Sequence, residues 1–359
     1  MENIKQRVVF FSQLSTQPRY IKRMQLFIDK GFDVTVVSFE RNRNKKNIIP
    51  REVAYLNLGT IDNGNYIKRL PVLLKSIYKM RSVINNGDLL YFFSDDIFIL
   101  LPLLMKNKNT IYYELGDITA FNIPFLKVFY YYIYGKILKK TDKIYVTSPA
   151  FKDYLINKYN IRNNIEIVEN KLIRKSFLSM EKPHFRTLEY GEIFTIGIIG
   201  FLCYPNILWF MNEYIKNDNR FRICLFGDGP LLDDLEYFIN KNQIKYFGTF
   251  KYPDDLENIY KQTDLSFIMY NSNILNVRLA LPNKLYESMF FKRPVLVTKN
   301  TFLAEKVSKY GIGFCWNQNE MADLIEYLNS REFIQEYNSL KDNFETIKEL
   351  DYFETVENI

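Results

Sequence analysis

Short apolar runs with the length of β-strands recur along the chain, and segments long enough for a helix separate them. The runs are apolar throughout, which is typical of strands in a parallel sheet covered by helices on both faces. In the first half they occupy residues 8–12, 33–39, 54–58, 89–93, 110–114, 143–148 and 165–169. In the second half they occupy residues 194–201, 222–227, 244–248, 265–270 and 294–298, with a weaker candidate at 313–316.

A polar stretch with little periodicity, residues 177–190, divides the two sets of strands. We therefore predict two Rossmann-like, doubly wound α/β domains, residues 1–176 and residues 191–345, joined by a linker at 177–190. The last residues, 346–359, are expected to form a C-terminal helix that packs back on the N-terminal domain. Sheets of this kind bind ligands at the carboxyl ends of their strands, so we expect the site in a cleft between the domains.

The net charge is +7, from 48 basic and 41 acidic residues, which is mild for a chain of 359 residues. It suits a phosphate-bearing ligand or an anionic membrane surface better than a nucleic acid, and a solvated surface without a partner is the plain alternative. The three scattered cysteines match neither a disulfide framework nor a zinc site, which indicates the cytoplasm. No apolar run resembles a signal peptide or a membrane-spanning helix.

The most informative segment runs from residue 276 to residue 298 and contains the sequence PNKLYE. Pro282 and Asn283 are typical of a helix start, with Asn283 as the expected cap. Lys284 and Glu287 lie three residues apart and therefore share one face of that helix. A helix N-terminus with a lysine suits a diphosphate, and a carboxylate one turn later can accept the hydroxyls of a ribose. The alternative is an ordinary capped helix with an exposed Lys–Glu pair.

This segment resembles the donor-binding signature of glycosyltransferases with the GT-B fold, of the kind found in bacterial polysaccharide biosynthesis. In that signature a P-x-K-x-x-E element precedes a small loop and a strand similar to PVLV. Further stretches resemble the family in the same order along the chain: KGFDVTVVS, ILKKTDKIYVTS, GIIGFLCYPNILWF, FGDGP and YFGTFKYPDDLENIYKQTDLSFIMY. The resemblance implies a nucleotide-diphosphate sugar, expected to be a UDP-sugar, with its ribose on Glu287 and its phosphates on Lys284 beside Asn283.

The resemblance also implies contacts to the donor outside this helix. Gly200 and Phe201 would offer backbone amides near the diphosphate, as the loop after the first strand of the C-terminal domain does in the family. The turn around Phe250 and Lys251 would lie near the nucleobase of the donor. Arg278 is a second candidate for contact with a phosphate.

The chain departs from the family pattern at one position. Many retaining members carry Glu-x7-Glu, whose second glutamate corresponds to Glu287, but Leu279 stands eight residues before it. The stereochemistry of retention therefore does not transfer with the resemblance. An inverting mechanism is therefore an alternative to a retaining one. Its site would have a lysine on the phosphates, similar to that of bacterial exopolysaccharide glucuronosyltransferases.

An inverting transfer needs a base that takes the proton of the acceptor hydroxyl. Glu114 and Asp117 lie at the end of the apolar run 110–114 and just after it, so we expect them at the carboxyl end of a strand. This passage resembles the segment where related enzymes carry a functional His or Asp, so Asp117 is our first candidate for the base and Glu114 our second. The alternative is a strand end followed by an aspartate that caps a helix.

We expect neither a metal nor a cofactor. The chain has no Asp-x-Asp motif and a single histidine, His184, which lies in the predicted linker. The acidic pairs at 95–96, 233–234 and 254–255 are interpreted as loop or first-turn residues that favour helix starts. The GDG of FGDGP lacks the third glycine of a dinucleotide fingerprint, which argues against an oxidoreductase.

The segment 121–140 mixes large aromatics with Lys127, Lys136, Lys139 and Lys140. It fits either a membrane interface near a lipid-linked acceptor or a core helix with a basic solvent face. We predict a hexosyltransferase that acts on a glycan or lipid-linked acceptor in capsule, lipopolysaccharide or exopolysaccharide assembly, in the cytoplasm or peripherally on the inner face of the cell membrane. A nucleotide-sugar epimerase of the same fold and a catalytically silent sugar-nucleotide-binding partner are the alternatives.

Overall fold

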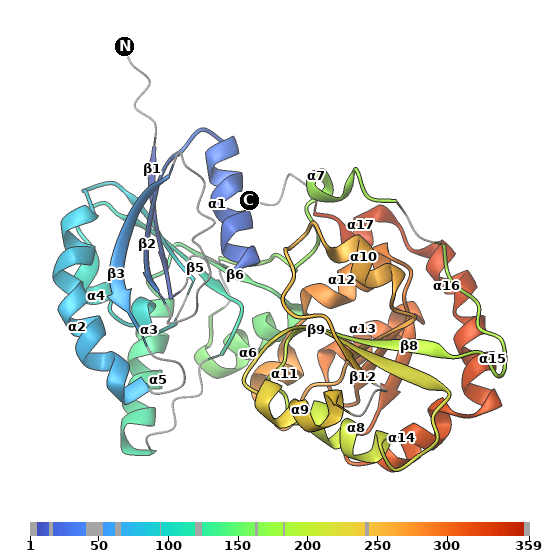
Figure 1. Ribbon diagram of the computed structural model, residues 1–359. Coiled ribbons are helices and arrows are strands. Elements are labelled where there is room, and N and C mark those ends of the chain that lie inside the picture. Colours follow the sequence, from blue (N-terminus) through green and yellow to red (C-terminus); the bar gives the residue numbers. More distant parts are fainter. Residues whose placement is uncertain are drawn as a thin grey trace. The chain divides into compact units, whose positions relative to one another are not determined.

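The computed structural model describes residues 6–13, 17–40, 53–61, 66–93, 95–118, 124–161, 164–181, 184–240 and 244–354 (Figure 1). The chain divides into two compact units, Met1–Glu169 and Asn170–Ile359. Each unit has one parallel β-sheet with helices packed against it, which confirms the predicted class of two doubly wound α/β units.

The sheet of the first unit has the strand order β3-β2-β1-β4-β5-β6-β7, and its pairings are parallel. The order reverses between β1 and β4, so the carboxyl ends of these two strands flank the point where such sheets bind ligands. The strands are β1 (Arg7–Ser12), β2 (Asp33–Glu40), β3 (Ala54–Thr60), β4 (Leu89–Phe92), β5 (Thr110–Leu115), β6 (Lys143–Val146) and β7 (Ile165–Ile167).

Helices connect these strands by crossovers, and right-handed crossovers place α1 and α2 on opposite faces of the sheet. Helix α1 buries Tyr20, Met24 and Phe27 and ends just before Gly31, whose φ of +84° lets the chain turn out of the helix. The described helices of this unit are α1 (Pro18–Asp29), α2 (Tyr66–Val83), α3 (Asp95–Phe98), α4 (Leu101–Leu104), α5 (Pro124–Leu138) and α6 (Pro149–Tyr159).

The sheet of the second unit has the order β10-β9-β8-β11-β12-β13, again with parallel pairings. Its order reverses between β8 and β11. The central strands are almost wholly buried, which explains why their sequences are apolar without alternation. The strands are β8 (Phe194–Phe201), β9 (Phe221–Asp228), β10 (Ile244–Tyr246), β11 (Leu265–Ile268), β12 (Val295–Thr298) and β13 (Gly313–Trp316).

Helices cover both faces of the second sheet. Figure 1 shows α8, α9 and α14 on one side of it and α10, α12 and α17 on the other. The described helices of this unit are α7 (Arg174–Phe177), α8 (Asn206–Tyr214), α9 (Leu232–Ile239), α10 (Leu256–Lys261), α11 (Leu275–Leu279), α12 (Asn283–Phe290), α13 (Phe302–Tyr310), α14 (Met321–Leu328), α15 (Arg331–Ser339), α16 (Lys341–Thr346) and α17 (Glu349–Tyr352).

The stretch predicted as a linker, residues 177–190, lies inside the second unit. Phe177, Phe185 and Leu188 belong to the core of that unit, so these apolar side chains hold the stretch against the domain, although its sequence is otherwise polar. Residues 182 and 183 lie outside the described part of this stretch.

A C-terminal helix was predicted over residues 346–359, and the structure has the short helix α17 in this range. Residues 355–359 lie outside the described residues. Tyr352 and Phe353 pack their rings against Phe290 of α12, with centroids 5.8 and 5.7 Å away. Leu172 and Phe353 form a parallel bridge. The described end of the chain therefore packs on α12, within the second unit.

Within the described residues, no helix combines the length and the apolar character that crossing a membrane requires. The three cysteines are free thiols, with Cys224 buried and the other two half-buried.

Candidate functional site

Two glycines shape the carboxyl edge of the second sheet. Gly200 near the end of β8 and Gly227 near the end of β9 are paired across the strands and have φ values of +104° and +136°. A Cβ on Gly227 would lie 1.8 Å from the carbonyl oxygen of Gly200, so only glycine permits this approach. A Cβ on Gly200 would lie 2.7 Å from Nζ of Lys284, which places the lysine ammonium directly against the glycine backbone.

Helix α12 begins at this edge. Pro282 has the extended backbone of a cap residue, and Asn283 is the first residue of the helix, so the prediction that Asn283 is the cap was wrong by one position. Proline has no side chain that could accept a hydrogen bond from the helix, and the structure has no side-chain cap here. The amide of Leu285 donates to the Pro282 carbonyl at 3.1 Å, which leaves the N–H groups of Asn283 and Lys284 for an anion, as at other helix N-termini that bind phosphate.

Lys284 and Glu287 lie on the same side of α12, in a poorly solvated environment. Glu287 is only 4% exposed, and its Oε2 accepts a hydrogen bond of 3.0 Å from the hydroxyl of Tyr260. Burial raises the pKa of Glu287, although Lys284 and the Tyr260 hydroxyl act against that rise. Burial also lowers the pKa of Lys284 despite the nearby carboxylate. These contacts rule out the alternative of a solvent-exposed Lys–Glu pair.

Tyrosines surround the Glu287 carboxylate. Tyr260 is fully buried, and the negative charge of Glu287 adds to burial in raising the pKa values of Tyr252, Tyr260 and Tyr270. Tyr270 stacks on Tyr204 with ring centroids 4.2 Å apart. These tyrosines could not be predicted from the sequence, because no local pattern links Tyr260 to a carboxylate 27 residues further along the chain.

The other predicted donor contacts are spread around this edge. Phe201 follows Gly200 and is 57% exposed, so its backbone lies at the surface of the strand end. Phe250 packs on the core of the unit, and the amide of Lys251 donates to Asp255 Oδ2 at 2.6 Å, so that amide is already used within the turn. Arg278 is an exposed residue of α11. The structure therefore groups Gly200, Lys284 and Glu287, with Asn283 beside them.

In the first unit, Glu114 lies near the end of β5 and is a buried, ion-paired carboxylate. Its Oε2 lies 2.8 Å from Arg23 Nε and 2.6 Å from the Tyr91 hydroxyl, and its Oε1 lies 3.6 Å from Arg19 Nε. Burial alone would raise the pKa of Glu114, but Arg23 and Arg19 hold it below its usual value. A carboxylate held this way has little affinity for a proton, which favours a structural role over that of a base.

Asp117 differs from Glu114 in its exposure. It follows the carboxyl end of β5, its side chain is 68% exposed, and its Oδ2 lies 3.9 Å from Arg19 Nη2. Arg19 thus bridges the buried and the exposed carboxylate. Arg19 and Arg23 are four residues apart on α1, a spacing that could have shown in the sequence that both face the same side.

A second polar group lies at the carboxyl edge of β4. Asp95 and Asp96 stand in the first turn of α3, as predicted, but they are only 6% and 8% exposed. The hydroxyl of Tyr113 donates to Asp95, and the side-chain amide of Gln13 donates to Asp96. These hydrogen bonds allow the two carboxylates to be buried where the strand order of the first sheet reverses.

Among the described residues, no group of His, Cys, Asp and Glu side chains is arranged to hold a metal ion. The prediction that the donor binds without a metal stays a prediction.

Comparison with known proteins adds a family match for part of the chain. Residues 193–330, in the second unit, match the family described as glycosyl transferases group 1. A sequence search of the curated proteins found no match.

Solved structures share the fold over nearly the whole chain. HepE from Anabaena, solved with UDP and glucose and also with UDP-glucose, is 14% identical over 97% of this chain and 95% of that chain, with a TM-score of 0.66. Sucrose-phosphate synthase from Thermosynechococcus elongatus is 13% identical over 95% of this chain and 93% of that chain, with a TM-score of 0.65. The apo form of the lipopolysaccharide outer core galactosyltransferase WaaB is 12% identical over 98% and 96%, with a TM-score of 0.63. At these identities the likeness shows the fold.

Proposed function

We propose that this chain, a glycosyltransferase with the GT-B fold, transfers a hexose from a UDP-sugar to a glycan or lipid-linked acceptor in the assembly of a bacterial surface polysaccharide. The UDP and UDP-glucose bound to HepE support UDP as the nucleotide of the donor. The likeness to a lipopolysaccharide galactosyltransferase supports a surface polysaccharide as the product.

One observation carries the proposal: the Lys284 ammonium lies against the glycine turn at Gly200, at the open N-terminus of α12, with Glu287 buried one turn later. A diphosphate at this place would give the desolvated ammonium a partner of opposite charge and would accept from the first N–H groups of the helix. The hydroxyl of Tyr260 donates a hydrogen bond to Oε2 of Glu287, which leaves Oε1 to accept hydrogen bonds from the ribose hydroxyls.

Asp117 is the proposed base for the acceptor hydroxyl if the transfer inverts the anomeric centre. It is exposed at a strand end, unlike Glu114, which is buried and which two arginines and a tyrosine hold in its ionised form. Because Leu279 stands where many retaining members carry a glutamate, we favour inversion, and the Asp117→Asn variant described below tests it.

A lipid-linked acceptor would require contact with a membrane, and one face of α5 suits this contact. Val128, Phe129 and Tyr132 are 76%, 62% and 62% exposed, and Lys136 Nζ lies 5.4 Å from the ring centre of Tyr132. Exposed aromatic residues beside lysines are typical of helices that lie in the interface of an anionic membrane. We therefore propose that the protein lies peripherally on the inner face of the cell membrane.

The test is UDP release from a set of UDP-sugars, measured with purified protein in the presence and absence of a bacterial membrane extract. We expect release from at least one UDP-sugar when the extract supplies the acceptor, and only slow hydrolysis without it. Conversion of the UDP-sugar without extract would indicate the epimerase, and no release under either condition would indicate the silent binding partner.

Two variants show whether release depends on the donor site. Lys284→Ala should abolish it, because the diphosphate loses its cation. Lys309→Gln removes a charge from an exposed position near the end of α13 in the same unit, and it should leave release unchanged.

A further inference from the structure

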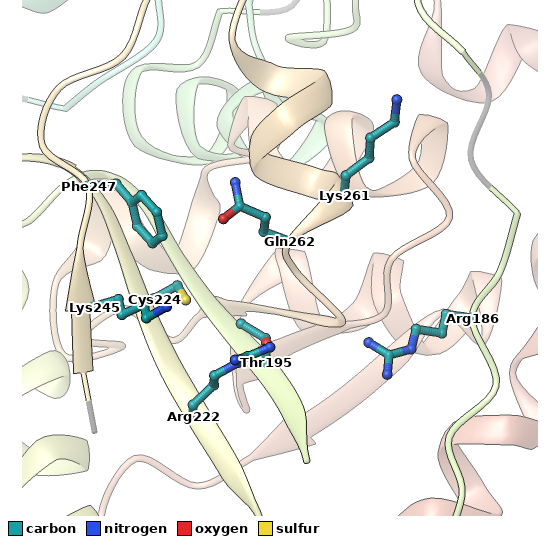
Figure 2. Close-up of a pocket in the computed structure, with 8 residues that line it drawn as sticks. All are labelled: Arg186, Thr195, Arg222, Cys224, Lys245, Phe247, Lys261 and Gln262. Carbon is teal, nitrogen blue, oxygen red and sulfur yellow. The ribbon is translucent and has the colours of Figure 1, made fainter. Parts of the chain in front are cut away.

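A pocket of about 230 Å³ opens at the amino ends of β8, β9 and β10, in the second unit. Thr195 of β8 lines it, whereas Gly200 of the donor site lies five residues later on the same strand, about 16 Å away at the rise of a parallel strand. The pocket is therefore separate from the donor site. Figure 2 shows its lining, in which four side chains are basic and none is acidic: Arg186, Arg222, Lys245 and Lys261.

Two of these cations are already compensated. Arg186 pairs with Asp264 at 3.0 Å and also contacts Glu192, so its charge is neutralised at the wall of the pocket. Lys261 pairs with Glu257 at 2.6 Å, and Figure 2 shows its ammonium pointing away from the other labelled groups.

The other two cations have no carboxylate partner among the described residues. Arg222 donates from Nε to Thr195 Oγ1 at 3.0 Å, which orients the side chain and leaves both terminal nitrogens for a ligand. Lys245 pairs in register with Cys224, and Arg222 lies two residues before Cys224, so the alternation of strand side chains brings the two cations to one face of the sheet. Two uncompensated cations at one pocket attract an anion.

The pocket also has an apolar wall and an amide. Phe247 lies two residues after Lys245, is 46% exposed, and stacks one face of its ring on Phe226 with centroids 4.6 Å apart. The other wall carries the side-chain amide of Gln262, at the end of α10. An aromatic ring and an amide beside the two uncompensated cations suit a ligand in which a sugar ring carries a phosphate.

We propose that this pocket binds a small phosphate monoester such as a sugar phosphate, with the phosphate on Arg222 and Lys245 and the sugar against Phe247. The ligand is a different molecule at a different edge of the sheet from the proposed donor. The proposal therefore does not depend on the proposed function.

The test uses the Lys284→Ala protein, in which the phosphate-binding lysine of the donor site is absent. Glucose 1-phosphate is titrated and followed by ³¹P NMR at low ionic strength. We expect a dissociation constant in the range of about 0.1–1 mM, because both cations are exposed and screened by solvent and salt. Adding Arg222→Gln or Lys245→Gln should weaken binding about tenfold each, and the two together should abolish it.

The matched control combines Lys309→Gln with Lys341→Gln, which removes two exposed charges from the same unit that do not line the pocket, and it should leave binding unchanged. Phe247→Ala should weaken the binding of glucose 1-phosphate but not the binding of inorganic phosphate. No binding to the Lys284→Ala protein, or equal binding after both pocket cations are removed, would overturn the proposal. In that case Lys245 would act only as an edge-strand charge that prevents pairing with another sheet. If the double variant does not fold, the two single variants decide the question.

Discussion

Replacing Glu287 by Gln should have two effects of opposite sign. Burial raises the pKa of Glu287 even against the charge of Lys284 and the hydrogen bond from Tyr260, so the ionised carboxylate costs free energy in the ligand-free fold. Glu287→Gln removes the charge and keeps an oxygen for Tyr260, and it should therefore raise the free energy of unfolding. The same change should weaken UDP binding, because the ribose hydroxyls lose a charged acceptor.

The gain in stability should depend on pH in a defined direction. Below the ordinary carboxyl pKa of 4.5, Glu287 is protonated in the folded and the unfolded chain. In that range the wild type and Glu287→Gln should therefore have the same free energy of unfolding as far as this position is concerned. As the pH rises toward the raised pKa of the folded state, the unfolded chain loses its proton first, so the stability of the wild type falls. The advantage of Glu287→Gln should therefore grow between pH 4.5 and neutral pH.

The loss in affinity follows from the hydrogen bonds to a charged group. Such a bond contributes about 1.5–3 kcal/mol, so the dissociation constant for UDP should rise about 10- to 150-fold. UDP at about a hundred times the wild-type dissociation constant adds about 2.7 kcal/mol to the stability of the wild type. At the same concentration it should add about 1.4 kcal/mol to a variant that binds tenfold more weakly. Calorimetric titration and chemical unfolding with and without UDP measure both effects.

A charge removed elsewhere provides the control. Glu326→Gln on the exposed side of α14 should change neither the stability nor the affinity for UDP. An unchanged affinity in Glu287→Gln would refute the donor role of this carboxylate. A loss of stability in the ligand-free variant would refute the reasoning from its raised pKa.

Three other outcomes test the rest of the site. Asp117→Asn should keep the affinity for UDP and lower turnover on saturating donor and membrane acceptor by about 10²–10⁴-fold, whereas a near-normal rate would indicate a transfer without this base. Arg23→Met removes the closest cationic partner of buried Glu114 and should lower the free energy of chemical unfolding by about 3–5 kcal/mol, with exposed Lys75→Met as an unaffected control. UDP affinity should be the same in a chelator as in manganese, and binding that vanishes in the chelator and returns with manganese would contradict a metal-free site.

The sequence alone was sufficient for the strands and for the start of one helix at the candidate donor site. Apolar runs of strand length must be buried on both faces, so the runs at 8–12 and 194–201 predicted β1 and β8, which the structure confirms at Arg7–Ser12 and Phe194–Phe201. The PNKLYE segment likewise predicted α12, because Pro282 favours a helix start and because Lys284 and Glu287 fall on one face by spacing alone. The cap was misplaced by one residue, since Asn283 is a good cap by residue type but Pro282 has the extended backbone.

The segment 177–190 shows where composition was misleading. Its polar residues predicted a linker, but three apolar side chains within it, Phe177, Phe185 and Leu188, are enough to bind it to the core of the second unit. Burial of a few large side chains outweighs the average polarity of a segment, because each buried aromatic or leucine side chain contributes about 1.5–3 kcal/mol.

The partners of the candidate residues were decided only by the tertiary structure. Tyr260 donates to Glu287 from 27 residues away, and Arg23 pairs with Glu114 from 91 residues away. Local periodicity states which face of an element is buried, but it carries no information on which strands become neighbours. The order of the strands brings these groups together, and the resulting burial and pairing give Glu287 a raised pKa and Glu114 a lowered one. Two glutamates that look alike in the sequence therefore differ in what they can do.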